Sequence, residues 1–138
     1  MAVASLTQMQ GADLAWTEDF GRGTDQAKAE HKIALVEFTG SDWCPACIEL
    51  NGAVFRNKSF ATYTKNNLVP IRIDFPREKE QPAALKKFNQ ELFERYKIEG
   101  FPTVVFLKDD REIGRIEGYD GKGPKAFIAQ IEKFKTAK

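Results

Sequence analysis

The chain has 138 residues, of which 42% are hydrophobic and 30% are charged. This length and composition are typical of one folded domain with its own core, and they argue against a disordered chain. The 21 lysines and arginines nearly balance the 20 acidic residues, and they are scattered along the chain. No surface of a single sign is therefore expected to attract nucleic acid or anionic lipid. No apolar run approaches the ~18 residues of a membrane helix, so no membrane span is expected.

The first 15 residues lack sustained periodicity. We expect residues 1–15 to form a flexible N-terminal arm, followed by a single domain at residues 16–138. Ala2-Val3-Ala4 resembles the small-residue pattern at a signal cleavage site, whereas the first basic residue, Arg22, comes too late for the charged start of a signal peptide. An exported protein whose signal peptide is not part of this chain is therefore one interpretation.

Periodicity and turn residues predict the following elements in chain order: a helix at 18–30, a strand at 33–38, a helix at 45–55, a strand at 68–75, a helix at 82–97, strands at 103–107 and 112–117, and a last helix that buries Phe127, Ile128, Ile131 and Phe134. Thr17 is expected to cap the first helix, and Pro70 indicates a strand start or a sheet edge. The last two strands should pair as an antiparallel hairpin. This alternation implies a layered α/β domain with a central mixed sheet of about four strands flanked by helices.

Both cysteines lie in the tetrad Cys44-Pro45-Ala46-Cys47, at the start of a predicted helix. A structural zinc site needs about four ligands, and the chain has two cysteines and one histidine, so no metal site is predicted. A purely structural disulfide that closes so short a loop would constrain the unfolded chain very little. A redox-active pair explains both the spacing and the position of the two residues.

The helix N-terminus predicts unequal roles for the two sulfurs. The unpaired amides of the first turn and the positive end of the helix dipole favour a Cys44 thiolate and lower its pKa, so Cys44 is the expected nucleophile. Cys47 lies one turn further on, on the apolar face, and is suited to resolve a mixed disulfide by attacking Cys44. Pro45 fits the first helical turn, where its missing amide hydrogen costs nothing.

Two segments together resemble the thioredoxin family: Trp43-Cys44-Pro45-Ala46-Cys47 after a buried strand, and Gly100-Phe101-Pro102-Thr103 before another. The resemblance extends from about residue 32 to the end of the chain. The lead-in Thr39-Gly40-Ser41-Asp42 is further similar to exported bacterial disulfide reductases and isomerases, including the DsbH type and the C-terminal domain of DsbD. The resemblance implies a thioredoxin fold with an N-terminal helical extension. It also implies a protein-disulfide reductase or isomerase that needs no cofactor.

The resemblance also implies roles for residues around the two catalytic cysteines. Pro102 would be a cis-proline beside the cysteine pair, where its backbone binds an extended substrate segment. Phe101 would contribute to substrate docking, and Trp43 would form a partly exposed platform over the sulfurs rather than a core residue. Pro45 and Ala46 would set the reduction potential, and because such residues vary it widely, the redox direction stays open.

The buried aspartate that assists proton transfer in thioredoxin is matched by Glu37, provided that the loop at residues 39–42 is one residue longer. Glu37 would then act as a general base beneath the thiol pair, with a raised pKa. The alternative is that Glu37 faces solvent at a strand edge. Pro70 falls where thioredoxin has a buried lysine, with Arg72 nearby, so the proton relay is expected to differ.

Three further features allow more than one interpretation. Residues 76–93 are longer than in thioredoxin and rich in charge, which indicates either a solvated helix extension or a partner-specific surface. His31 is expected to be an exposed polar residue rather than a catalytic one. Asp42 either modulates the charge of Cys44 or completes the turn before it.

The expected protein is a monomer that acts on protein substrates carrying disulfides or thiols and is recycled by a separate redox partner. We expect it to be exported, to a bacterial periplasm, with the cytoplasm as the alternative. The competing function is a thioredoxin-like binding module whose cysteines form a passive disulfide. Within the enzyme class, the sequence does not separate reductase, isomerase and oxidase.

Overall fold

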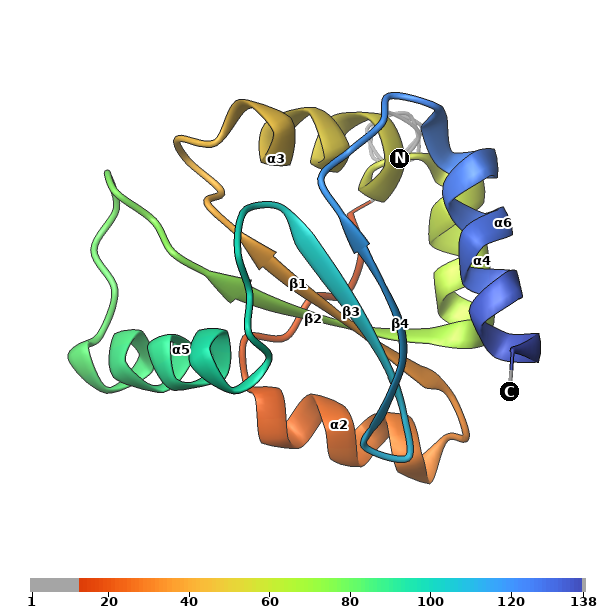
Figure 1. Ribbon diagram of the computed structural model, residues 1–138, viewed down its shortest axis with the longest axis horizontal. Helices are drawn as coiled ribbons and strands as arrows, with labels where there is room; N and C mark the ends of the chain where they lie inside the picture. Colours follow the sequence, from red (N-terminus) through yellow and green to blue (C-terminus); the bar gives the residue numbers. More distant parts are fainter. Residues whose placement is uncertain (1–12, 138) are drawn as a thin grey trace, which may run out of the picture.

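The computed structural model describes residues 13–137 and contains one mixed sheet (Figure 1). The elements in chain order are α2 (Phe20–Ala29), β1 (Ile33–Thr39), α3 (Pro45–Leu50), the π-helical turn η1 (Asn51–Phe55), α4 (Lys58–Asn67), β2 (Leu68–Asp74), α5 (Ala83–Arg95), β3 (Thr103–Lys108), β4 (Arg111–Glu117) and α6 (Gly123–Thr136). The four strands lie in the order β2-β1-β3-β4, with β1 parallel to β2 and antiparallel to β3. The predicted α/β architecture, the antiparallel β3–β4 hairpin and the N-terminal helix before β1 are confirmed.

Helices cover both faces of the sheet. Successive side chains of the central strand β1 point to opposite faces, and all of them are buried. Leu35 packs in a cluster with Leu50 on the side of α3, α4 and α6, whereas Val36 packs with Leu92 on the side of α2 and α5 (Figure 1). Glu37 shares the parity of Leu35. The carboxylate of Glu37 is therefore placed under α3, the helix that carries the cysteines.

The start of the first helix differs from the prediction. Asp19, not Thr17, is the N-cap, since its carboxylate accepts a hydrogen bond from the N–H of Arg22 at 3.0 Å. Thr17 instead pairs with the edge strand β2. Its N–H donates to the Pro70 carbonyl at 3.1 Å, and its carbonyl accepts from the N–H of Arg72 at 2.8 Å. Pro70 thus lies in an edge strand, as predicted, where its lack of an N–H is tolerated.

The chain before the first helix is anchored to the core in the part that the structure describes. Leu14 is 8% exposed and belongs to the hydrophobic cluster under α3. The ring of Trp16 meets Phe55 edge-on, with 5.1 Å between the ring centroids. We call residues 14–17 the N-terminal strap. The rest of the predicted arm, residues 1–12 with Ala2-Val3-Ala4, lies outside the described residues.

Two segments differ from the sequence prediction. Helix α4 was not predicted because its sequence is mostly polar; Asn57 caps it by accepting hydrogen bonds from the N–H groups of Ser59 and Phe60, and Phe60 is fully buried. The interpretation of the charged stretch as a helix extension is wrong for residues 76–82, which form an irregular loop before α5. We call residues 76–82 the charged loop.

Candidate active site

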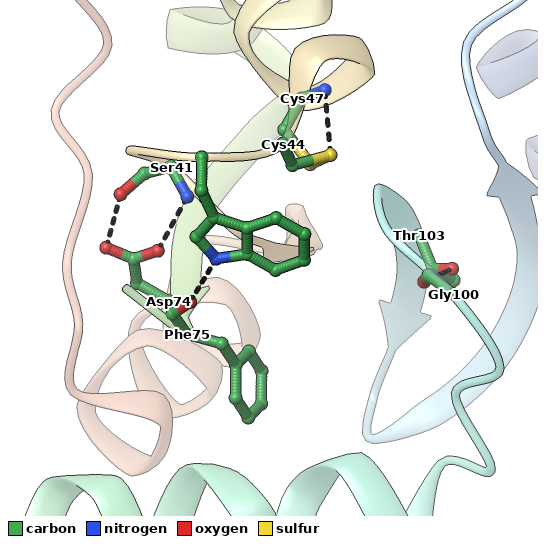
Figure 2. Close-up of a disulfide and its surroundings, with 8 residues drawn as sticks. Ser41, Cys44, Cys47, Asp74, Phe75, Gly100 and Thr103 are labelled. Carbon is green, nitrogen blue, oxygen red and sulfur yellow. Dashed lines mark hydrogen bonds between the residues drawn. A yellow bond between two sulfur atoms is a disulfide. The ribbon is translucent and has the colours of Figure 1, made fainter. Parts of the chain in front are cut away.

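The two cysteines lie at the start of α3, just after the turn that follows β1, at one end of the sheet. They form a disulfide with 5.2 Å between their Cα atoms. Cys44 is the N-cap of α3, and its Sγ accepts a hydrogen bond from the N–H of Cys47 at 3.2 Å (Figure 2). Cys44 is 6% exposed and Cys47 2%, so Cys47 is the more deeply buried sulfur. Pro45, the first helical residue, is exposed, and Ala46 is half-buried.

Trp43 is half-buried and held from several sides. Its indole N–H donates to the carbonyl of Phe75 at 2.7 Å, and its ring meets Phe101 edge-on at 5.9 Å. The guanidinium carbon of Arg77 lies 3.6 Å from the centre of the Trp43 ring, a distance at which a cation is attracted to the π face. The ring also packs against Gly40, where a Cβ atom would overlap the indole. The Trp43 ring therefore has a fixed orientation next to Cys44.

The segment before β3 carries Pro102, whose peptide bond with Phe101 is cis. Pro102 is buried, while Phe101 is half-buried and packs on Phe75, with 5.1 Å between ring centroids. The turn is closed by the Thr103 hydroxyl, which donates to the Gly100 carbonyl at 2.7 Å (Figure 2). A cavity of about 230 Å³ lies beside residues 99–103 and the end of β4. The structure thus provides a hollow next to Phe101 and Pro102.

Glu37 is 1% exposed, on the central strand β1, so the alternative that it faces solvent at a strand edge is wrong. Arg72, rather than Pro70, lies opposite it in the β1–β2 register, and the Arg72 Nε donates to Glu37 Oε1 at 3.1 Å. Burial raises the pKa of Glu37 to about 7, because the loss of solvation outweighs the attraction of Arg72. A cavity of about 110 Å³ under α3 is lined by both Glu37 and Cys47. Glu37 and Cys47 thus border one shared space, which is large enough to hold water.

A second buried carboxylate, Asp74, was not identified from the sequence. It lies at the end of β2, is 1% exposed, and accepts hydrogen bonds from the N–H of Ser41 at 3.0 Å and from its hydroxyl at 2.6 Å (Figure 2). Lys79 of the charged loop lies 3.3 Å from the same carboxylate. Asp74 therefore fixes the turn that delivers the chain to the cysteines.

Asp42 joins this turn to the charged loop. Its carboxylate accepts hydrogen bonds from the N–H groups of Arg77, Glu78 and Lys79 at 2.9, 2.9 and 3.1 Å. These backbone donors lower the pKa of Asp42 below its ordinary value. The carboxylate thus holds Arg77 at the position from which it reaches Trp43. No local sequence signal predicts these contacts, because α3, α4 and β2 separate Asp42 from the charged loop.

Three further points from the sequence concern His31, a metal site and a membrane helix. His31 is exposed in the turn before β1, at the opposite end of that strand from the cysteines. Among residues 13–137, no group of three or more histidine, cysteine or acidic side chains is arranged to hold a metal ion. No helix in the same range is long and apolar enough to cross a bilayer.

Comparison with known proteins agrees with this geometry. The thioredoxin-like domain family matches residues 20–135. The disulfide bond reductase DsbH of Chlamydia pneumoniae is 31% identical over 122 residues, covering 88% of this chain and 72% of that protein. Thioredoxin-1 of Drosophila melanogaster is 33% identical over 105 residues, covering 76% of this chain and 84% of that protein. A solved structure of a DsbH oxidoreductase superposes with a TM-score of 0.82 at 30% identity, covering 91% of this chain and 88% of that one.

Proposed function

Since the chain belongs to the thioredoxin-like family and is a thiol-disulfide oxidoreductase, we propose that it reduces or isomerises disulfides of exported proteins, with Cys44 as nucleophile and Cys47 as the resolving thiol. The observation that carries this proposal is the asymmetry of the pair. Cys44 caps a helix and receives an N–H from the first turn, whereas Cys47 is turned inward to a cavity shared with Glu37. A two-step exchange requires this difference, because one cysteine attacks the substrate and the other resolves the mixed disulfide.

In the first step, the Cys44 thiolate attacks one sulfur of the substrate disulfide. A bond forms between Cys44 and that sulfur, the substrate S–S bond breaks, and the electron pair leaves on the other substrate sulfur, which takes a proton from solvent. The helix N-terminus supports this step because the N–H of Cys47 points at the Cys44 sulfur.

In the second step, Cys47 attacks Cys44 in the mixed disulfide. The Cys47 thiol gives its proton to the Glu37 carboxylate through the shared cavity, the Cys44–Cys47 bond forms, and the remaining substrate sulfur leaves with the electron pair. The substrate gains two electrons and the enzyme ends as the disulfide. A carboxyl group whose pKa is about 7 is suited to this exchange near neutral pH, because it accepts and returns a proton with little cost in either direction.

Substrate docking is assigned to the surface around the pair. Trp43 and Phe101 form one wall, and the cavity beside Pro102 gives an extended segment room to lie near Cys44. Ile48, one residue after Cys47, is 52% exposed and adds apolar area near the pair. Exposed apolar groups rimmed by polar ones are typical of surfaces that bind other proteins.

We further propose an exported, monomeric enzyme that a separate electron donor returns to the dithiol form. The name of its relative DsbH, a disulfide bond reductase, supports reduction as the main direction. Pro45 and Ala46 between the cysteines are the residues assigned to set the reduction potential. Equilibrating the pair in glutathione buffers measures that potential, and a value well below the glutathione poise is expected for a reductase.

A trapping experiment tests the central proposal. Cys47→Ser removes the resolving thiol but leaves the nucleophile, so this variant should accumulate mixed disulfides with disulfide-containing protein substrates. The matched variant Cys44→Ser should trap none and should not reduce insulin in the presence of dithiothreitol. If wild type does not reduce insulin and Cys47→Ser forms no mixed disulfide, the pair is a passive disulfide in a binding module and the proposal fails.

A further inference from the structure

The guanidinium of Arg72 is held on three sides by residues from different parts of the chain. Its Nε donates to Glu37 at 3.1 Å, and its Nη2 donates to the Oδ1 atom of Asn51 at 3.0 Å. The Trp16 ring covers it, with the guanidinium carbon 4.0 Å from the ring centre. The Arg72 side chain is only 21% exposed. These contacts fix both the position and the plane of the cation.

Asn51 and the cysteine helix belong to one continuous helical segment. Asn51 begins η1 directly after the last residue of α3, and it lines the same cavity as Cys47 and Glu37. A π-helical turn inserts a residue relative to an α-helix and changes the direction of the side chains around it; such turns are frequent at functional sites. Asn51 therefore contacts Arg72 from the helical segment that also carries the resolving cysteine.

Trp16 reaches the same guanidinium from the N-terminal strap. The strap is anchored on both sides of Trp16, since Leu14 lies in the core and Thr17 forms two backbone hydrogen bonds with β2. One of these bonds comes from the N–H of Arg72 itself. Trp16 is thus a fixed cover and not a loose surface side chain.

The charges that act on Glu37 come from β2. Arg72 lowers the pKa of Glu37, whereas Asp74, further along β2, raises it; Asp74 is itself paired with Lys79. From α3, the neighbour across the cavity is Cys47, which titrates only when the disulfide is reduced. On the other flank, β3 places the apolar residue Val104 opposite Glu37. Arg72 is therefore the cation that offsets the burial of this carboxylate.

We propose that Trp16 and Asn51 are positioning residues that hold the Arg72 guanidinium against the Glu37 carboxylate and thereby control proton transfer between Glu37 and the Cys47 sulfur. We call the three residues Trp16, Asn51 and Arg72 the guanidinium cage. The inference rests on the proposed role of Glu37 in the resolving step. A loosened cage leaves Arg72 more hydrated and further from Glu37, so the carboxylate binds its proton more tightly and releases it at higher pH.

The direct test is the titration of Glu37, followed by NMR of its carboxyl carbon in the oxidised protein, in which Cys47 does not titrate. Asn51→Ala and Trp16→Leu should each move the midpoint upward by about half to one pH unit, the scale of one hydrogen bond or one cation–π contact. Arg72→Met should move it further in the same direction. Trp16→Phe, which keeps an aromatic face over the guanidinium, should stay close to wild type.

Matched controls separate the cage from a general loss of packing. Phe20→Leu removes an aromatic ring from the other face of the sheet, and Asn67→Ala removes an amide that bonds to Tyr63 and Lys135. Within residues 13–137, neither residue shares a hydrogen bond or a ring contact with the guanidinium cage. Neither control should therefore shift the midpoint. Unchanged or lowered midpoints in both Asn51→Ala and Trp16→Leu would overturn the cage.

The rate of the resolving step gives a second readout, because it is measured on the working enzyme. The release of a reduced peptide from its mixed disulfide with Cys44, followed across pH, should show the same upward shift of its inflection in Asn51→Ala and Trp16→Leu. If Glu37→Gln leaves the wild-type inflection in place, the proposed role of Glu37 fails. If Glu37→Gln removes the inflection but the cage variants do not move it, only the present inference fails.

Discussion

The Sγ atom of Cys44 accepts a hydrogen bond from the N–H of Cys47. The donor is one of the free amides of the first turn of α3, which have no partner within the helix. When the disulfide is reduced, the same amide is in place to stabilise negative charge on Cys44. The fold thus favours one sulfur of the pair as a thiolate before any substrate arrives.

Alkylation of the reduced protein should therefore be selective. At pH 7, iodoacetamide should modify Cys44 at least about tenfold faster than Cys47, because the thiolate is the reacting form and Cys47 is the more buried sulfur. Both cysteines lie in one tryptic peptide, residues 33–56, so tandem mass spectrometry of its fragments after short reaction times measures both rates. Cys44→Ser supplies the reference for Cys47 alone. Equal rates at the two sulfurs would contradict the assignment of the nucleophile.

Glu37 should make stability depend on pH. Its pKa is raised from 4.5 to about 7 in the folded protein, so proton binding favours folding. This stabilisation is fully present below the unfolded pKa and is lost as the pH rises through 7. Glu37→Gln stays neutral at every pH, so its free energy of unfolding relative to wild type should rise between pH 4.5 and 7.5, by about 3 kcal/mol at most.

Urea unfolding of the oxidised proteins at several pH values measures this difference. The absolute stability of the variant at one pH is not decisive, because the amide also changes the hydrogen bond with Arg72. The slope with pH is decisive, since only a titrating group produces it. A constant difference between the two proteins from pH 4.5 to 7.5 would mean that Glu37 is not the group that titrates near neutrality.

Asp42 should control the charged loop and, through it, Trp43. Asp42→Ala removes the acceptor of three backbone hydrogen bonds, so the amides of Arg77, Glu78 and Lys79 should exchange with solvent faster. Because Arg77 then loses its place over Trp43, the fluorescence of that residue should change. The catalytic efficiency toward protein substrates should fall more than that toward a small disulfide, which does not need the docking surface.

The control for this variant is Asp120→Ala, which removes an exposed aspartate that also accepts a backbone N–H, but in the turn before α6. It should leave the exchange of the charged loop unchanged. Low pH offers a second check without mutation. The pKa of Asp42 is lowered, so its contribution is present above the unfolded pKa and is lost as the pH falls through the folded one. Protection of the three amides that survives full protonation of Asp42 would contradict its role.

Gly40 should be sensitive to the smallest enlargement. A Cβ atom there would overlap the indole of Trp43, so Gly40→Ala should destabilise the protein by about 1–3 kcal/mol and alter Trp43 fluorescence. Gly52→Ala is the matched control, because nothing lies within 4 Å of its Cβ position. Gly52 is an exposed helical glycine, so its replacement by alanine should stabilise the protein by about 0.4–1 kcal/mol. Thermal unfolding of both variants measures the contrast.

The working pair and the strands around it could be predicted because their signals are local. The spacing of Cys44 and Cys47, the helix-compatible Pro45, and the apolar run of β1 are each contained in one short segment. Helix α4 was missed because its signal is mainly the cap formed by Asn57, in a sequence with few apolar residues. Thr17 was misassigned as a cap because its real partner is a strand far along the chain.

The surroundings of the pair were decided by the tertiary structure alone. Glu37 could be suspected from the sequence, but its burial depends on the neighbours of β1, and its pairing with Arg72 depends on the β1–β2 register. No local sequence signal predicts that Asp42 holds the charged loop. Its carboxylate bonds to backbone N–H groups, and these bonds do not depend on the side chains of the loop. Sequence alone determines where the sulfurs lie along a helix, since that is a matter of spacing. Only the folded sheet decides which charges and rings surround them, because parallel pairing brings distant segments side by side.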